Sequence, residues 1–213
     1  MKLNLFSLLV ILSYIWSCKK EDNKKAVSAG MYDSTFNYHK FNPALHVNLT
    51  FDSILNTKNG SYSMDIDLDG KIDLVIQQQI LLDKITQNYL TNANYPYCRI
   101  ILKNGLEVAT KTETYPIGLG QTSSVDWVDT IQYKTRIDPI SSWTETDSRV
   151  WWWMWVAPYT PFWGTHGCWY NLNNTEKYIG IGMKVGSRYK YGWMKVIENS
   201  LENMQFISYA IEK

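Results

Sequence analysis

The C-terminal part of the chain constrains the fold most strongly. Three strand-like segments end the chain, at residues 177–185, 189–197 and 204–211. Gly186-Ser187-Arg188 separates the first two segments, and residues 198–203 separate the second from the third. Short polar connections of this kind join neighbouring antiparallel strands, because a parallel pair needs a much longer crossover. The sequence therefore predicts an antiparallel meander at this end.

The rest of the chain also reads as strands rather than helices. The clearest hairpin pattern places Asn104-Gly105 between residues 99–103 and 106–110, since Asn-Gly suits the positive φ angles of a type I′ turn. Other strand candidates are residues 44–51, 61–67, 72–80, 124–133 and 150–156, whereas the apolar spacing of residues 80–90 could suit a short helix. These segments predict an all-β fold, an antiparallel β-sandwich of jelly-roll type, formed by a single domain over residues 31–213.

The balance of charge limits the partners of this domain. The chain has 21 Lys and Arg residues against 20 Asp and Glu residues, with no long cluster of either sign. Binding to nucleic acid or to an anionic surface needs a clustered basic excess. We therefore expect no nucleic-acid partner.

The N-terminal segment predicts export. Met1-Lys2 supplies a positive start, and residues 3–16 are apolar over a length typical of a signal peptide but too short to span a bilayer. The run Ile15-Trp16-Ser17-Cys18 resembles the lipobox of bacterial lipoproteins. The resemblance implies that residues 1–17 are removed and that acyl chains on Cys18 anchor the protein to a membrane. The alternative is an ordinary signal peptide with an incidental cysteine.

The residues after Cys18 predict a tether and an address. Residues 19–25 are polar and mostly charged and cannot pack in a core, so we expect residues 18–30 to form a flexible linker. Lys20-Glu21-Asp22 resembles the export tag of surface lipoproteins of the Bacteroidota. That resemblance implies an outer-membrane lipoprotein facing the cell exterior, with a periplasm-facing anchor as the alternative. Of the cysteines that remain, Cys98 and Cys168 could form a disulfide in an oxidising compartment or stay as free buried thiols.

An acidic loop is the best-formed chemical motif. Residues 65–73 place carboxylates at loop positions one, three, five and nine, with glycine at position six. Ca²⁺ prefers six to eight oxygen ligands, and alternate acidic residues around a glycine turn supply them. The predicted ligands are Asp65, Asp67, Asp69 and Asp73 through their side chains, and Lys71 through its carbonyl. Position twelve is Ile76, so the loop is not an EF-hand; it resembles DxDxDGxxD loops of exported β-rich proteins. The alternative is a hairpin whose aspartates face water.

A tryptophan-rich segment is the predicted ligand surface. Its tryptophans are Trp143, Trp151, Trp152, Trp153, Trp155, Trp163 and Trp169. On a strand, Trp151, Trp153 and Trp155 share one face while Trp152 and Met154 share the other, so one aromatic face needs a cover. Together with Tyr159 and Trp163, the first set could bind a glycan or a protein. The alternative is that the Pro/Gly-rich loop of residues 157–167 folds over the second face.

An enzymatic role has weaker support in the sequence. There is no nucleophile elbow, phosphate loop or HExxH helix. A polysaccharide hydrolase would need two carboxylates across a cleft, and the acidic residues near the tryptophans are Asp126, Asp129, Glu145 and Asp147. A structural accessory subunit of an outer-membrane complex is a third alternative. We expect a non-enzymatic binding module.

One further resemblance bears on the fold. The DxDxDGxxD loop together with Tyr191-Gly192-Trp193 is similar to a set of secreted or lipid-anchored bacterial β-sandwich proteins of unassigned function. Because glycine in a strand marks a close approach, we expect Gly192 to let a neighbouring ring lie flat on the strand.

Overall fold

The computed structural model describes residues 26–81, 97–118, 121–138, 142–144, 148–155, 163–166, 168–169, 172, 174–200 and 203–213. The strands in these residues are β1 (Val27–Ser28), β2 (Phe36–His46), β3 (Thr50–Asp52), β4 (Thr57–Met64), β5 (Leu74–Leu81), β6 (Tyr97–Leu102), β7 (Leu106–Gly118), β8 (Gln121–Val128), β9 (Arg136–Ile137), β10 (Trp143–Thr144), β11 (Ser148–Trp155), β12 (Trp163–His166), β13 (Glu176–Val185), β14 (Arg188–Ser200) and β15 (Asn203–Glu212). Within this described part there is no helix long and apolar enough to cross a membrane.

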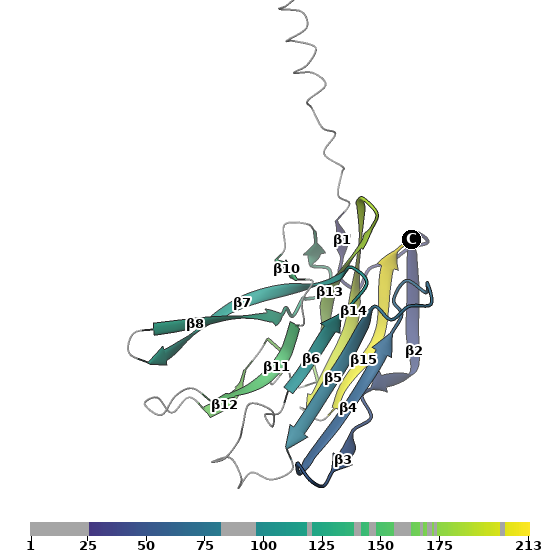
Figure 1. The fold of residues 1–213 in the computed structure, drawn as a ribbon. Coiled ribbons are helices and arrows are strands. Elements are labelled where there is room, and N and C mark those ends of the chain that lie inside the picture. Colours follow the sequence, from purple (N-terminus) through teal and green to yellow (C-terminus); the bar gives the residue numbers. More distant parts are fainter. Residues whose placement is uncertain are drawn as a thin grey trace, which may run out of the picture.

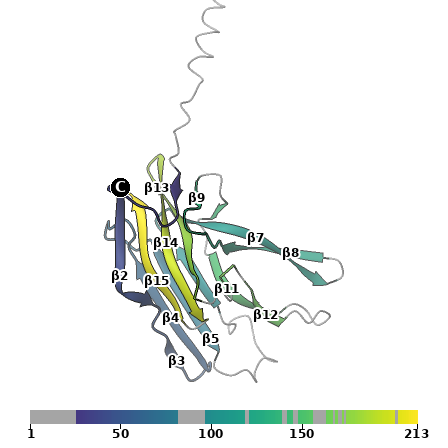
Figure 2. The same cartoon turned by 180° about the vertical axis from the view of Figure 1, so that it is seen from behind.

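The strands form two facing sheets joined through one long strand. The hydrogen-bonded order is β2-β15-β14-β13-β7-β8-β11-β6-β5-β4-β3. The first residues of β7 pair with β13, and the later ones pair with β8 as a hairpin that extends to one side of the body (Figure 1). Seen from behind, β2, β15, β14 and β13 form the layer nearest the viewer, with β4 and β5 beyond them (Figure 2). The predicted all-β antiparallel sandwich is confirmed; one bridge between β11 and β8 is parallel.

The main hydrophobic core fills the space between the two sheets. Ile76 and Ile100 enter it from β5 and β6, and Ile179 and Phe206 enter it from β13 and β15. These side chains are completely buried, because alternate residues of each strand point inward. The predicted C-terminal meander is confirmed: β13, β14 and β15 pair in sequence order, antiparallel throughout.

A second, smaller cluster covers the outer face of this meander. Met194 faces the main core, whereas Tyr191 and Trp193 point the other way and pack with Val27 and Ala29. β1, which contains Val27, pairs with β9. The prediction that the flexible tether extends to residue 30 is therefore wrong at its C-terminal end. The physical reason is that Val27 and Ala29 are apolar residues, and they bury themselves together with the rings of Tyr191 and Trp193 on the outer face of β14.

The predicted hairpin at Asn104-Gly105 is wrong in its pairing. Both residues adopt positive φ, 53° and 75°, so the tight turn itself is formed. The flanking strands separate, however: β6 pairs with β5 and β11, whereas β7 pairs with β13, β10 and β8. The turn thus carries the chain from one sheet to the other. The Asn-Gly pair therefore specified the reversal of chain direction. The strands with which β6 and β7 pair were decided by the burial of these two strands in different sheets.

The prediction for Gly192 is also corrected. A side chain at this position would meet the backbone of β15: a Cβ would collide with the carbonyl oxygen of Ala210 and lie 2.9 Å from Cα of Ile211. The close approach is therefore between two strands, not between a strand and a ring. The ambiguous segment at residues 80–90 lies outside the described residues beyond position 81, and its first two residues end β5.

Candidate functional site

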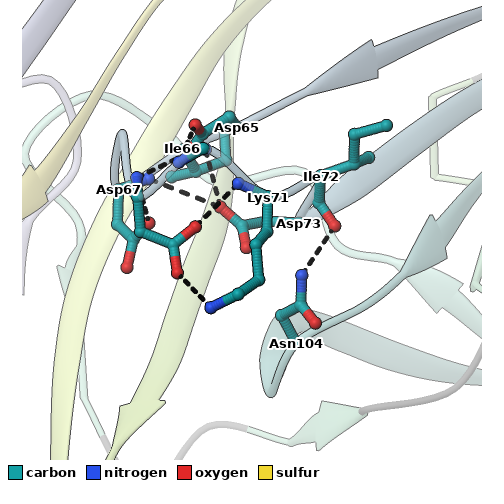
Figure 3. Close-up of polar contacts among 9 residues, drawn as sticks. Asp65, Ile66, Asp67, Lys71, Ile72, Asp73 and Asn104 are labelled. Atoms are coloured by element: carbon teal, nitrogen blue, oxygen red, sulfur yellow. Dashed lines mark hydrogen bonds and ion pairs between the residues drawn. The ribbon is translucent and has the colours of Figure 1, made fainter.

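The acidic loop connects β4 to β5 at one end of their ladder. Met64 and Leu74 form the last pair of this ladder, and the Asp73 N–H donates to the Met64 carbonyl at 2.8 Å. Between them the chain turns through Leu68 and Gly70, which both have positive φ. The segment is therefore the predicted strand-loop-strand arrangement, with its carboxylates folded into a compact loop (Figure 3).

Three of the four predicted carboxylates come together. One side-chain oxygen from each of Asp65, Asp67 and Asp73 lies within 4.8 Å of the others. Asp65 and Asp67 follow the end of β4, and Asp73 precedes β5. A cation among these oxygens would thus connect the two ends of the loop. We call these three residues the carboxylate cluster.

Asp73 is the buried member of the carboxylate cluster. Its side chain accepts hydrogen bonds from the backbone N–H groups of Ile66 at 2.7 Å and Asp67 at 3.4 Å. Both bonds end on Oδ2, so neither uses Oδ1. Burial raises the pKa of Asp73 above its ordinary value, the two backbone donors oppose that change, and the charges of Asp67 and Asp65 add to it. A nearby cation would favour the ionised form.

Backbone donors hold the other two carboxylates of the cluster. Asp65 accepts from the N–H groups of Asp69 at 3.2 Å and Gly70 at 2.8 Å, and Asp67 accepts from the Asp69 N–H at 3.1 Å. These bonds preorganise the loop, because they set the direction of each carboxylate before any ion arrives. They also compensate part of the repulsion among the three negative charges.

Asp69 and Lys71 form a separate pair. The Lys71 ammonium lies 2.8 Å from Oδ2 of Asp69, and the Lys71 N–H donates to Oδ1. These hydrogen bonds lower the pKa of Asp69 and raise that of Lys71. Asp69 thus lies outside the cluster to which the sequence pattern assigned it. The sequence predicts the Lys71 carbonyl as a metal ligand. The contacts that Lys71 makes in the loop instead use its N–H and its ammonium group, and both are with Asp69.

Residues far away in the sequence complete the surroundings of the loop. The Asn104 side-chain amide donates to the Ile72 carbonyl at 2.9 Å, and the Lys103 N–H donates to the Asp73 carbonyl at 2.7 Å. Tyr209 of β15 reaches the loop from the opposite sheet and donates to the Asp65 carbonyl at 3.5 Å. Burial raises the pKa of Tyr209, and the negative charges of the carboxylate cluster raise it further. The sequence does not predict Tyr209 as part of this site, because nothing local to β15 marks its proximity to the loop.

The carboxylate cluster has the chemistry of a hard-cation site. Its ligand atoms are all oxygens, and three carboxylates offer up to six of them. Asp73 is only 2 % exposed. Acidic residues without a structural role usually stay in contact with water. The cluster could therefore hold a metal ion through Asp65, Asp67 and Asp73.

The two cysteines of the domain are free thiols. Cys98 lies in the main core, with its thiol 3.8 Å from the sulfur of Met204. Cys168 is half-buried and lies 3.8 Å from a carboxylate oxygen of Glu113. Burial raises the pKa of each thiol to about 12. The Cys98–Cys168 disulfide is therefore not formed, and the alternative of free cysteines describes the structure.

The tryptophan-rich segment is only partly described. β11 contains Trp151, Trp153 and Trp155 and pairs with β12, where Trp163 is opposite Trp155. The side chains of these four residues, and the whole of Tyr159, lie outside the described part. Trp169 is completely buried, and its indole N–H donates to the Val128 carbonyl at 3.0 Å. At least this tryptophan belongs to the core.

Two of the four acidic residues that a hydrolase could use, Asp126 and Asp129, lie in the described part of the chain. Asp126 on β8 accepts a hydrogen bond from the Thr112 hydroxyl at 2.6 Å. Asp129 follows the same strand, and burial raises its pKa. Glu145 and Asp147 lie outside the described residues.

Comparison with known proteins identifies no family for this chain. No protein-family model matches this chain, and neither the curated proteins nor the solved structures give a match.

Proposed function

We propose that this chain is an exported, lipid-anchored binding module, and that calcium bound by the carboxylate cluster stabilises its β-sandwich. The signal-like N-terminus and Cys18 support export and anchoring to the outer membrane. The observation that carries the calcium proposal is the convergence of Asp65, Asp67 and the buried Asp73 within 4.8 Å. Module and anchor together would display a ligand-binding surface outside the cell.

Calcium is favoured over magnesium by the form of the loop. Ca²⁺ accepts many oxygen ligands in flexible geometry, whereas Mg²⁺ demands a near-ideal octahedron and retains several waters. A nine-residue loop with three convergent carboxylates suits the first ion. Bound calcium would neutralise the charge repulsion in the cluster and hold the start of β5 against the end of β4. It would also stiffen the contact with Tyr209 of the opposite sheet.

Calorimetric titration of the detergent-solubilised, metal-free mature chain tests this proposal. We expect calcium to bind with a dissociation constant on the order of 10⁻⁴ to 10⁻³ M, the range of extracellular modules, and more tightly than magnesium. At ten times this constant, calcium should stabilise the fold by about 1.4 kcal/mol.

Matched variants distinguish a specific site from a diffuse negative charge. Asp67→Asn should abolish the calorimetric signal. Asp69→Asn removes the same charge from the same loop but should weaken calcium binding much less than Asp67→Asn does, because Asp69 lies outside the carboxylate cluster. If both variants weaken calcium equally, or if wild-type protein binds no calcium, the proposed site is wrong.

A further inference from the structure

A second candidate site lies on the outer face of the C-terminal meander. There a cavity of about 550 Å³ opens between the β1–β2 connection, the segment before β9, and strands β2 and β13 to β15. This volume is within the range of small-ligand pockets. We call it the tyrosine pocket, because its lining includes Tyr32, Tyr38, Tyr133 and Tyr178.

The tyrosine pocket presents aromatic rings to solvent. Tyr32 and Tyr133 are 50 % and 54 % exposed, and Tyr38 is 39 % exposed. Tyr32 and Tyr38 stack face to face with ring centroids 4.0 Å apart. Most exposed apolar side chains on a protein surface are scattered, so several large rings around one cavity mark a binding surface.

Buried contacts hold these rings in place. The indole N–H of Trp193, which is 2 % exposed, donates to the Met31 carbonyl at 2.9 Å and fixes the segment that bears Tyr32. Gly30 has a φ of 78°, and a Cβ there would lie 2.6 Å from the ring of Tyr133. The Ala29 N–H donates to the Thr135 carbonyl at 2.9 Å and ties the two rims together. The pocket is therefore preformed, which reduces the entropy cost of binding.

The polar lining is nearly balanced in charge. The Lys195 ammonium lies 2.7 Å from a carboxylate oxygen of Glu176, and Lys40 adds one further positive charge. Gln132 and Ser208 contribute neutral polar groups. A phosphate-binding site would need a stronger positive excess, and a purely apolar ligand would leave these groups unpaired.

We propose that the tyrosine pocket binds a sugar unit of a glycan, with a pyranose ring against Tyr32 or Tyr133 and its hydroxyl groups bonded to Lys195, Glu176 and Gln132. A pyranose has C–H faces that pack on aromatic rings and hydroxyls that both donate and accept hydrogen bonds, so it matches both parts of the lining. This inference rests on the proposed binding function and relocates its ligand site from β11 and β12 to the meander.

The test uses the detergent-solubilised mature chain. Its binding is measured on a printed array of plant, animal and microbial oligosaccharides, and the oligosaccharide that binds best is then titrated. Tyr32→Ala and Tyr133→Ala should each raise the dissociation constant by about tenfold or more, because each removes a stacking surface. Tyr133→Phe keeps the ring and should bind within about twofold of wild type. Tyr32 and Tyr133 are half-exposed, so both alanine variants should remain folded, with a modest loss of stability for the ring contacts removed.

The control for a general surface effect is Tyr62→Ala, an exposed tyrosine on β4 outside the pocket. It should leave binding unchanged. If an oligosaccharide binds but only Trp151→Ala or Trp153→Ala weakens it, the pocket is wrong and the binding module survives. If no oligosaccharide on the array binds, both the pocket and the glycan ligand are overturned, whereas the calcium titration still tests the loop separately.

Discussion

At the scale of single residues, Asp73 has two separable roles. Its carboxylate accepts a hydrogen bond from the buried Ile66 N–H, and its charge belongs to the carboxylate cluster. Asp73→Asn keeps an acceptor oxygen but removes the charge, whereas Asp73→Ala removes both. Without metal, Asp73→Ala should lower the free energy of unfolding by about 1–3 kcal/mol, because the Ile66 N–H loses its partner. Asp73→Asn should be at least as stable as wild type.

Urea unfolding with chelator and with calcium measures both roles of Asp73. Calcium should stabilise wild type and neither variant. In wild type without metal, the sign of the pH dependence follows from the raised pKa of Asp73. The folded state binds this proton more tightly, so the contribution is present below the ordinary value of 3.8 and is lost as pH rises through the folded-state pKa. If Asp73→Asn is as unstable as Asp73→Ala without metal, the separation of roles is contradicted.

At the scale of elements, β14 is the strand on which both hydrophobic clusters depend. Its inward residues, such as Met194, enter the main core, and its outward residues, such as Trp193, form the wall of the tyrosine pocket. Gly192 precedes Trp193 on this strand and lies directly against the backbone of β15. The strand can serve two layers because residue direction alternates along it.

Gly192→Ala should therefore destabilise the protein by roughly 1–3 kcal/mol, the usual cost of overpacking. The rigid Ala210 carbonyl cannot move aside without breaking the β14–β15 ladder. Gly182→Ala, on the neighbouring strand, is the matched control: its Cβ would lie 3.3 Å from the Trp143 ring, a side chain that can shift. Thermal unfolding should rank Gly192→Ala well below Gly182→Ala, and equal losses would contradict this explanation.

At the scale of the whole molecule, the fold and the proposed anchor meet near β1. The described chain begins at residue 26, and β1 at Val27–Ser28 is already paired with β9. The first residues that line the tyrosine pocket, Gly30 and Tyr32, follow β1 directly and so lie close in sequence to the proposed anchor. Export and display would place this pocket close to the membrane end of the domain.

Lipidation is tested by growing a Bacteroidota host with an alkyne fatty acid. Wild type should incorporate the label and sediment with membranes, whereas Cys18→Ser should lose the label and leave the membrane fraction. Cys168→Ser is the control and should remain labelled, because its half-buried thiol lies in the folded domain. Protease added to intact cells should digest wild type, and protection would indicate the periplasm-facing alternative.

Patterns among neighbouring residues were enough to predict the local features of this fold. Alternating side chains and short turns predicted the β13–β14–β15 meander, and aspartates spaced around Gly70 predicted the loop between β4 and β5. These features depend on φ preferences and on the period of two in a strand, which are local properties.

Which strands pair and which distant residues meet depend on the complete fold. The Asn104-Gly105 turn is local, but the separation of β6 from β7 follows from burial against β5 and β13. The withdrawal of Asp69 from the carboxylate cluster depends on its pairing with Lys71 in the folded loop. The tyrosine pocket joins Tyr32 to Tyr133 and Trp193 across most of the chain. Such contacts form because the complete fold buries the most apolar surface, and no single segment of sequence shows how much surface the other segments will cover.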